Sequence, residues 1–291
     1  MRIATYFDII TGRADGNPTY VAAALKRKNI PGVFESDVLA PNATVSNHGK
    51  YDLNIWVDWG EDALKELIPY EILFPPDPSV YWCSDSHIGF DYRLDTARKF
   101  SHVFVAQKEA VEQFAREGVK AEWLPHAVEP LAYPKQERSI KEFDVCFVGH
   151  INNQKRIDFL DRMFREFPKF YYGQQLFEKA AEKFGRSKIS LNIAHSNDVN
   201  MRNFEIMGSG SFMLTEYVPS MEELFQDGIH CAWYHDFDEA VDKAKFYLEN
   251  DDLREKIAQK GYELMMERNT IDHRVDRMLE VVNDKVLVGA T

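Results

Sequence analysis

The segment MRNFEIMGSG at 201–210 carries residue types that together can bind an anion and a diol. Arg202 and Glu205 stand three residues apart, so they share one face of a helix. Asn200 precedes them and is a favoured helix cap. The guanidinium of Arg202 and the backbone N–H groups of a first helical turn can bind phosphate oxygens. The carboxylate of Glu205 can accept hydrogen bonds from two ribose hydroxyls. A nucleoside diphosphate carries both groups, and Phe204 supplies apolar contact.

These residues also have a purely structural interpretation. Arg202 and Glu205 can form a surface ion pair worth only about 0.2–0.5 kcal/mol. Gly208 and Gly210 can simply end the helix instead of allowing a ligand to approach. The spacing alone does not decide between the two interpretations.

A second cluster of candidate ligands follows the strand-like DVCFVG, in the segment HINNQKR. Gly149 ends the strand, and Asn152 or Asn153 is expected to cap a helix that starts near residue 154. Lys155 and Arg156 then lie in the first turn, where cations oppose the helix dipole. We expect an anion between these cations and the backbone amides. The alternative is a solvated basic pair.

The first half of the chain contributes two glycine- and acid-containing loops at predicted strand ends. Gly12 lies in DIITGRADGNP, which is either a loop beneath a diphosphate or an ordinary turn before a helix capped by Asn17 or Asp15. In CSDSHIGFDYR, Asp85, His87 and Arg93 follow a strand and are expected to face a cleft.

Three further residues have both a ligand and a structural interpretation. His126, in LPHAVEP, either touches the ligand or braces a hinge. Tyr172 and Gly173 end a predicted strand, where a nucleobase could lie against the backbone, or where Tyr172 belongs to the core.

The acidic segment DFDE at 236–239 resembles a metal-binding Asp-x-Asp pair. Asp236 directly precedes a predicted helix, and Asp238 and Glu239 fall in its first turn. Helix capping and the helix dipole explain carboxylates at these positions. We therefore expect a cap here and no metal.

The elements that must position these residues alternate between short β-branched or aromatic runs and longer amphipathic runs, which predicts an α/β fold with parallel sheets. The predicted strands cover 3–8, 53–59, 79–84, 102–106, 121–124, 144–149, 169–173, 189–194, 212–216 and 231–234. Helical patterns include 18–28 and 108–117, and the chain is helical from about 237 to its end. A proline-rich stretch at 124–143 lacks either period and is interpreted as a linker between two domains.

Composition narrows the class of protein. The chain has 291 residues, and its formal net charge of −12 argues against a nucleic-acid-binding surface. Cys83, Cys146 and Cys231 are widely spaced in apolar context, which predicts buried free thiols and a reducing cytoplasm. We expect neither a signal peptide nor a transmembrane segment.

The segments CFVGHINNQKR, RNFEIMGSGSFMLTEY, MEELFQDGIHCAWY and LPHAVEP together resemble the spore-maturation-protein (CgeB-like) branch of the GT-B glycosyltransferases, which is related to the retaining family 4 enzymes. The resemblance is strongest over 143–283. It implies two Rossmann-like domains with parallel sheets, an acceptor-side domain at 1–130 and a donor-side domain at 131–270. It also implies a C-terminal helix at 271–291 that packs back toward the N-terminal domain.

The resemblance also implies residue roles. The glutamate matching Glu205 binds the ribose of a nucleoside diphosphate sugar, and basic residues matching Arg156 and Arg202 hold the diphosphate. A histidine near the donor sugar favours His87 over Asp85 as the catalytic residue. Many retaining relatives carry an acid eight positions before the glutamate, but this chain has Asn197 there.

The sequence thus predicts a cytoplasmic, metal-independent hexosyltransferase that uses a UDP- or GDP-sugar and needs no cofactor. Retention is the outcome that the resemblance implies, whereas inversion would need a base such as Asp15, Asp85 or His87. The acceptor is a glycan, a lipid-linked molecule or a small molecule, and not a nucleic acid. The alternatives are a non-catalytic sugar-nucleotide or glycan-binding protein and a GT-B nucleotide-sugar epimerase. The oligomeric state is not predicted.

Overall fold

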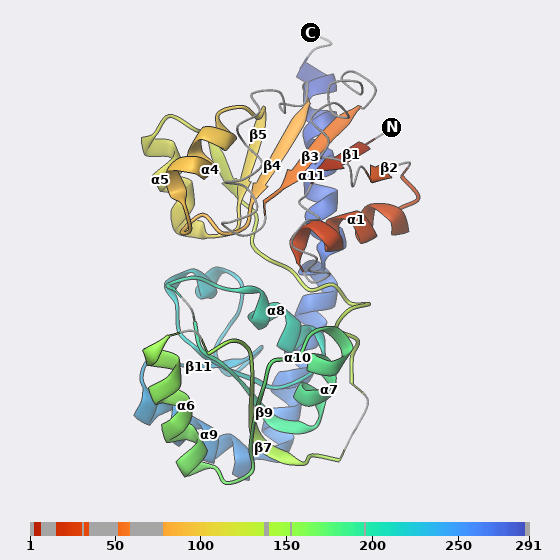
Figure 1. Cartoon of the computed structure of the whole chain (residues 1–291). Coiled ribbons are helices and arrows are strands. Elements are labelled where there is room, and N and C mark those ends of the chain that lie inside the picture. Colours follow the sequence, from red (N-terminus) through yellow and green to blue (C-terminus); the bar gives the residue numbers. More distant parts are fainter. Residues whose placement is uncertain are drawn as a thin grey trace. The chain divides into compact units, whose positions relative to one another are not determined.

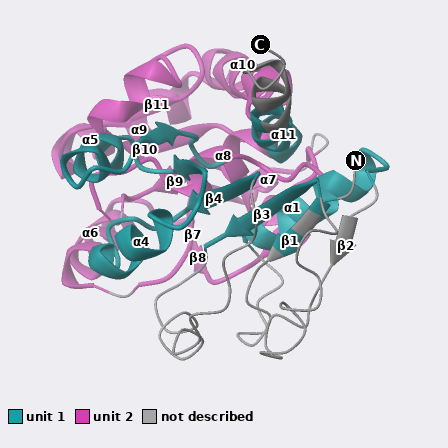
Figure 2. Ribbon diagram, turned by 90° about the horizontal axis from the view of Figure 1, so that it is seen from above, with its two compact units in different colours: residues 1–126, 271–291 teal, residues 127–270 magenta. Residues whose placement is uncertain are grey.

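The computed structural model describes residues 3–6, 16–30, 32–34, 52–58, 78–136, 140–151, 153–194 and 196–288. Internal contacts divide the chain into two units, coloured separately in Figure 2. Unit 1 comprises residues 1–126 together with 271–291, and unit 2 comprises residues 127–270.

Unit 1 is an α/β unit (Figure 1). Its strands are β1 (Ile3–Tyr6), β2 (Gly32–Phe34), β3 (Leu53–Val57), β4 (Ser79–Cys83), β5 (His102–Val105) and β6 (Ala121–Trp123). Its helices are α1 (Asn17–Arg27), α4 (Phe90–Ala97), α5 (Lys108–Arg116) and α11 (Ile271–Val288). Within the described ranges the strands pair in parallel in the order β2-β1-β3-β4-β5-β6.

Side chains alternate across this sheet, and the two faces are covered by different helices. One face forms a core with α4 and α5 that contains Trp56, Tyr81, Cys83, Leu94, Ala97, Val103, Val105, Ala110 and Phe114. Phe104 points to the opposite face, where the Arg277 guanidinium of α11 lies 5.8 Å from its ring centroid. The helix at the end of the chain therefore belongs to the N-terminal unit, as predicted.

Polar contacts fix α11 on unit 1. Arg274 Nε and Nη2 donate to the carbonyl oxygens of Pro125 and His126, at 2.8 and 3.0 Å. Asp272 pairs with Arg27 of α1 at 2.6 Å. These bonds attach the end of the chain to both the first helix and the last strand connection of unit 1.

Unit 2 repeats the α/β plan (Figure 1). Its strands are β7 (Phe143–Val148), β8 (Phe170–Gly173), β9 (Ser187–Asn192), β10 (Met213–Glu216) and β11 (Ala232–Tyr234). Its helices are α6 (Gln154–Glu166), α7 (Phe177–Gly185), α8 (Met201–Gly208), α9 (Phe237–Glu249) and α10 (Asp251–Arg268), with a 3-10 turn, η2 (Pro219–Glu223). Over the described part the parallel strand order is β11-β10-β9-β7-β8.

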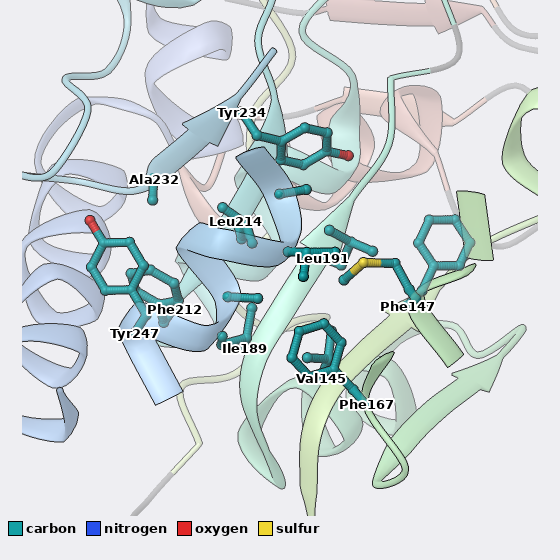
Figure 3. Packing of buried hydrophobic residues seen from close by; sticks show 14 of the residues in the cluster. Val145, Phe147, Phe167, Ile189, Leu191, Phe212, Leu214, Ala232, Tyr234 and Tyr247 are labelled. Carbon is teal, nitrogen blue, oxygen red and sulfur yellow. The ribbon is translucent and has the colours of Figure 1, made fainter. Parts of the chain in front are cut away.

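Alternate residues of these strands build the main core of unit 2. Figure 3 shows the cluster with Val145, Phe147, Phe167, Ile189, Leu191, Phe212, Leu214, Ala232, Tyr234 and Tyr247 labelled. Leu160 and Met163 of α6 and Ala240 and Ala244 of α9 belong to the same cluster. These two helices therefore cover one face of the sheet.

The predicted α/β class and every predicted strand are confirmed. The strand β2 was not predicted, because its run of three residues, Gly32–Phe34, is too short to show a period. Cys83, Cys146 and Cys231 are free and buried, as predicted. No helix within the described ranges is long and apolar enough to cross a membrane.

Candidate functional site

The strand order of unit 2 places a switch point between β7 and β9. The chain turns from β7 outward to β8 on one side and then returns to β9 on the other side. In open parallel sheets ligands bind at the carboxyl ends of strands where the order reverses. The loop after β7 and the loop between β9 and α8 meet this description, and both contain predicted site residues.

Arg156 connects these two strand ends. Its guanidinium donates to the carbonyl oxygens of His150, after β7, and Ile193, after β9, at 3.0 and 2.6 Å. The side chain is buried, and burial lowers the pKa of Arg156, although the nearby Glu216 opposes this shift. Arg202 also lowers that pKa, so the two guanidinium groups interact electrostatically. Arg156 thus brings positive charge to the switch point without reaching into solvent.

Asn153 caps α6, because its side-chain oxygen accepts the N–H of Arg156 at 2.9 Å. This confirms the cap prediction, while Asn152 lies outside the described residues. Lys155 Nζ pairs with Glu216 Oε1 at 2.5 Å, and Glu216 Oε2 accepts the N–H of Ala194 at 3.2 Å. The carboxylate of Glu216 therefore balances the charge of Lys155, which the sequence analysis assigned to a bound anion.

The cap of α8 is also confirmed. Asn200 accepts the N–H of Arg202 at 3.0 Å, and the Asn203 side chain accepts the N–H of Asn200 at 3.1 Å. Arg202 Nη1 lies 2.6 Å from Glu205 Oε2, with the two side chains only 18% and 6% exposed. The pair is therefore largely buried and differs from the solvated surface pair that the sequence left open. Phe204 is fully buried against Phe225, so its apolar contact is made within the core.

The two glycines after Glu205 have a packing role. A Cβ at Gly208 would lie 2.5 Å from Val128 Cγ2. Gly210 has a φ of +75°, and a Cβ there would lie 3.0 Å from Lys135 Cγ. The close approach that these glycines allow is that of the segment 127–136, and α8 ends at Gly208 as the structural interpretation expected.

Other predicted donor residues lie at the ends of β7, β8 and β9. Gly149 follows β7 directly, and its N–H donates to the Gly173 carbonyl at 3.0 Å. Tyr172 is 41% exposed, which excludes the core interpretation, and its ring stacks on Phe147 at 6.2 Å. Asn197 is exposed in the loop after β9. Their contacts with a donor stay predictions.

In unit 1, the strongest polar feature at the strand ends was missed by the sequence interpretation. Asp58, directly after β3, pairs with Arg93 Nε at 2.6 Å, and both side chains are at most 1% exposed. Tyr81 donates to the same carboxylate at 2.8 Å. Burial raises the pKa of Asp58, and Arg93 opposes this shift. The expectation that Arg93 faces a cleft is wrong, because the buried carboxylate binds it.

The loop after β4 presents Asp85 and His87. Gln107 Nε2 donates to the Ser84 carbonyl at 2.7 Å, and Ser86 Oγ donates to Gln107 Oε1 at 2.8 Å. His87 is exposed and Asp85 is half-buried. Buried hydrogen bonds therefore fix a short turn whose exposed residue is the predicted catalytic histidine, and its catalytic role stays a prediction.

His126 is buried, and its contact with a donor stays a prediction. Its Nδ1 lies 3.0 Å from Asn17 Nδ2, and its ring packs near Trp82. Asn17 does not cap α1, because Gly16 occupies the cap position and the Asn17 side chain turns to His126 instead. Gly12 and Asp15 lie outside the described residues.

The acidic segment after β11 is a helix start. Asp236 Oδ1 accepts the N–H of Glu239 at 2.9 Å, which confirms the predicted cap of α9. Asp238 pairs with Arg162 at 3.2 Å. Among the residues described, no group of three His, Cys, Asp or Glu side chains is arranged to hold a metal ion.

Comparison with solved structures defines the fold. HepE from Anabaena, in complex with UDP and glucose, matches with a TM-score of 0.68 and 12% identity, covering 98% of this chain and 100% of that chain. The sucrose-phosphate synthase of Thermosynechococcus elongatus matches with a TM-score of 0.67 and 11% identity over 100% of both chains. An alpha-glucosyltransferase in complex with UDP and a 13-mer DNA gives 0.67 and 9%, covering 97% and 99%. The fold is GT-B.

Sequence comparison then gives the family. Residues 135–280, half of the chain, match the family described as glycosyl transferase-like. The chain belongs to this family and is a glycosyltransferase. No curated protein matches the chain.

Proposed function

We propose that the protein transfers a hexosyl group from a UDP-sugar to an acceptor hydroxyl. The family match covers nearly all of unit 2, which carries all of the predicted donor residues except Gly12 and His126. Solved structures of the same fold include HepE in complex with UDP-glucose, with a TM-score of 0.63 and 12% identity. These likenesses support UDP as the first nucleotide to test.

The observation that carries the proposal is the charge arrangement at the β7 and β9 strand ends. Arg156 and the Arg202–Glu205 pair converge there beside the capped start of α8. Departure of the sugar leaves negative charge on the diphosphate, so cations fixed before the reaction stabilise the transition state. We assign Arg202, Arg156 and Lys155 to the diphosphate and Glu205 to the ribose.

The same proposal covers the branch of the family, the stereochemistry, the catalytic residue, the acceptor and the location. We place the chain in the CgeB-like branch, related to the retaining family 4 enzymes, and infer metal-independent transfer with retention. Unit 1 supplies the acceptor side, with His87 near the donor sugar and Asp85 as the alternative catalytic residue. The acceptor is a glycan, a lipid-linked molecule or a small molecule, and the net charge of −12 argues against DNA. The three buried thiols agree with a cytoplasmic location.

One observation favours a second candidate, a non-catalytic sugar-nucleotide-binding protein. The position where many retaining relatives carry an acid is occupied by Asn197, an exposed amide. The adjacent Asp198 is buried and accepts a hydrogen bond from Ser196 Oγ at 3.0 Å. A binding protein would keep the nucleotide contacts and lack turnover.

The test combines binding with turnover. Thermal shift with UDP, GDP and their hexose derivatives should show stabilisation by the UDP series, because a ligand bound only by the native state raises its stability. Calorimetry on R202A and E205A should show weaker UDP binding, whereas R165A, which breaks an exposed pair with Asp161, should bind UDP normally. Hydrolysis or transfer identifies the enzyme, whereas tight binding without turnover supports the second candidate. Unchanged UDP affinity in both R202A and E205A would refute the site.

A further inference from the structure

A group of buried polar side chains lies where α8 begins, on the carboxyl ends of β9 and β10. Asn192 ends β9, Thr215 lies in β10 and Asn203 lies in the first turn of α8. Each of the three is at most 2% exposed. Burial of polar groups costs free energy unless they are hydrogen-bonded. The arrangement of this group is therefore determined by its hydrogen bonds.

Asn203 uses every hydrogen-bonding site of its side chain. Its Oδ1 accepts the Nδ2–H of Asn192 at 3.3 Å and the backbone N–H of Asn200 at 3.1 Å. Its Nδ2 donates to Thr215 Oγ1 at 3.1 Å and to Met213 Sδ at 3.6 Å. A side-chain amide has two donor and two acceptor sites, so Asn203 has none left for a ligand. Any effect of Asn203 on a ligand is therefore exerted through its neighbours.

The other two members of the group close the network. Asn192 Nδ2 also donates to Thr215 Oγ1, at 3.1 Å, so all three side chains are bonded to one another. The backbone carbonyl of Asn192 accepts the hydroxyl of Tyr234, in β11, at 3.0 Å. The network thus spans the three neighbouring strands β9, β10 and β11. A buried network whose members are all satisfied specifies one arrangement of the elements that it joins.

The element that this network supports is the start of α8. The N–H of Asn200, the cap residue, is bonded to Asn203, and the Asn200 side chain accepts the N–H of Arg202 at 3.0 Å. Arg202 directly precedes Asn203 in the chain and carries one of the charges assigned to the diphosphate. A shift of this first turn would move the Arg202 guanidinium and the neighbouring backbone amides together.

We propose that Asn203 is a positioning residue that holds the first turn of α8, and with it Arg202, where the diphosphate of the donor binds. This inference rests on the proposed function and extends it to a residue that touches no substrate. Without the Asn203 amide the first turn samples other positions, and the apparent affinity falls in proportion to the time spent in the binding position. A residue that served stability alone would leave the affinity of the folded protein unchanged.

The experiment compares affinity with stability in the same variants. Calorimetry gives the dissociation constant of UDP, and urea unfolding gives the stability, for the wild type, N203A, T215V, R202A and the double variant R202A/N203A. T215V keeps the buried volume and removes only the hydroxyl that Asn203 contacts, so it decides the question even where N203A does not fold. The control is S187A, which removes a buried hydroxyl bonded to the Lys183 carbonyl at 2.8 Å, at the opposite end of β9.

We expect N203A to bind UDP about tenfold more weakly and T215V about threefold more weakly, because the first turn then spends less of its time in the binding position. R202A/N203A should lose little beyond R202A, because Asn203 acts through Arg202. S187A should bind UDP like the wild type, whatever its loss of stability. The stoichiometry of each titration reports the folded fraction, so unfolding is not mistaken for weaker binding.

Two results would overturn the inference. T215V could lose stability and keep the wild-type affinity for UDP, or N203A could weaken binding by the same factor with and without the Arg202 side chain. A wild-type protein that does not bind UDP would refute the proposed function, and with it the role of Asn203. Normal binding by the wild type, weaker binding by R202A and unchanged binding by T215V would refute only the inference.

Discussion

Gly261 lies in the middle of α10, where two physical effects of an alanine substitution oppose each other. Alanine favours a helix interior over glycine by about 1 kcal/mol, so helix propensity alone predicts that G261A stabilises the protein. In the structure, a Cβ at this position would lie 2.4 Å from the backbone oxygen of His230 and 3.3 Å from Met207 Cγ and Sδ. The nearest atom belongs to the backbone and does not move as a flexible side chain would.

The sizes of these two effects decide whether G261A stabilises or destabilises the protein. Overpacking a close contact costs about 1–3 kcal/mol, and a backbone partner places this site toward the upper end of that range. After the propensity gain is subtracted, G261A should lower the free energy of unfolding by about 1–2 kcal/mol. For a chain of this size the melting temperature should fall by about 2–8 °C.

Urea and thermal unfolding of G261A check this result. The control is K256A, an exposed substitution in the same helix, which should leave stability unchanged or slightly higher. Equal stabilisation by both substitutions would mean that α10 stands clear of the loop at His230. The packing described for this side of unit 2 would then be refuted.

Three further predictions concern charge and burial. E216Q removes the carboxylate paired with Lys155, so UDP affinity in calorimetry should rise by about two- to tenfold, and a loss of affinity would contradict the assigned site. Hydrogen bonding by Arg277 lowers the pKa of Glu122 from 4.5, so this carboxylate stabilises the fold above pH 4.5 and the contribution disappears as the pH falls through the folded-state pKa. E122Q should therefore unfold more easily than the wild type at pH 7 and equally in acid, as followed by urea titration. Because burial raises the pKa of all three cysteine thiols, a thiol reagent should react with the unfolded protein only.

The hydrophobic period of the sequence, together with its turn and cap residues, predicted most of the fold. Strands buried on both faces appear as continuous apolar runs, and the caps at Asn153, Asn200 and Asp236 depend only on neighbouring residues. Asn17 was misassigned because its side-chain partner, His126, is 109 residues away. Local rules cannot detect such a partner.

In the candidate site too, contacts between neighbouring residues could be predicted, whereas contacts between residues far apart in the sequence could not. Arg202 and Glu205 could be paired from their spacing, but Glu216 could not be assigned to Lys155, because 61 residues separate the two in the sequence. The segment 127–136 packs on α8 through Val128, which lies against Gly208, and the spacing of these residues does not indicate this contact either. The Asp58–Arg93 pair joins the end of β3 to α4, and nothing in the spacing of these two residues indicates their contact.

The return of α11 to unit 1 has a consequence for synthesis of the chain. Residues 127–270 are contiguous, so unit 2 has all of its own elements once they leave the ribosome. The N-terminal unit must wait for Ile271, Arg274 and Met278, which are buried in the finished structure. Nascent-chain folding should then run against the usual N-to-C order, with the later unit completed first and the earlier one closed by the final helix.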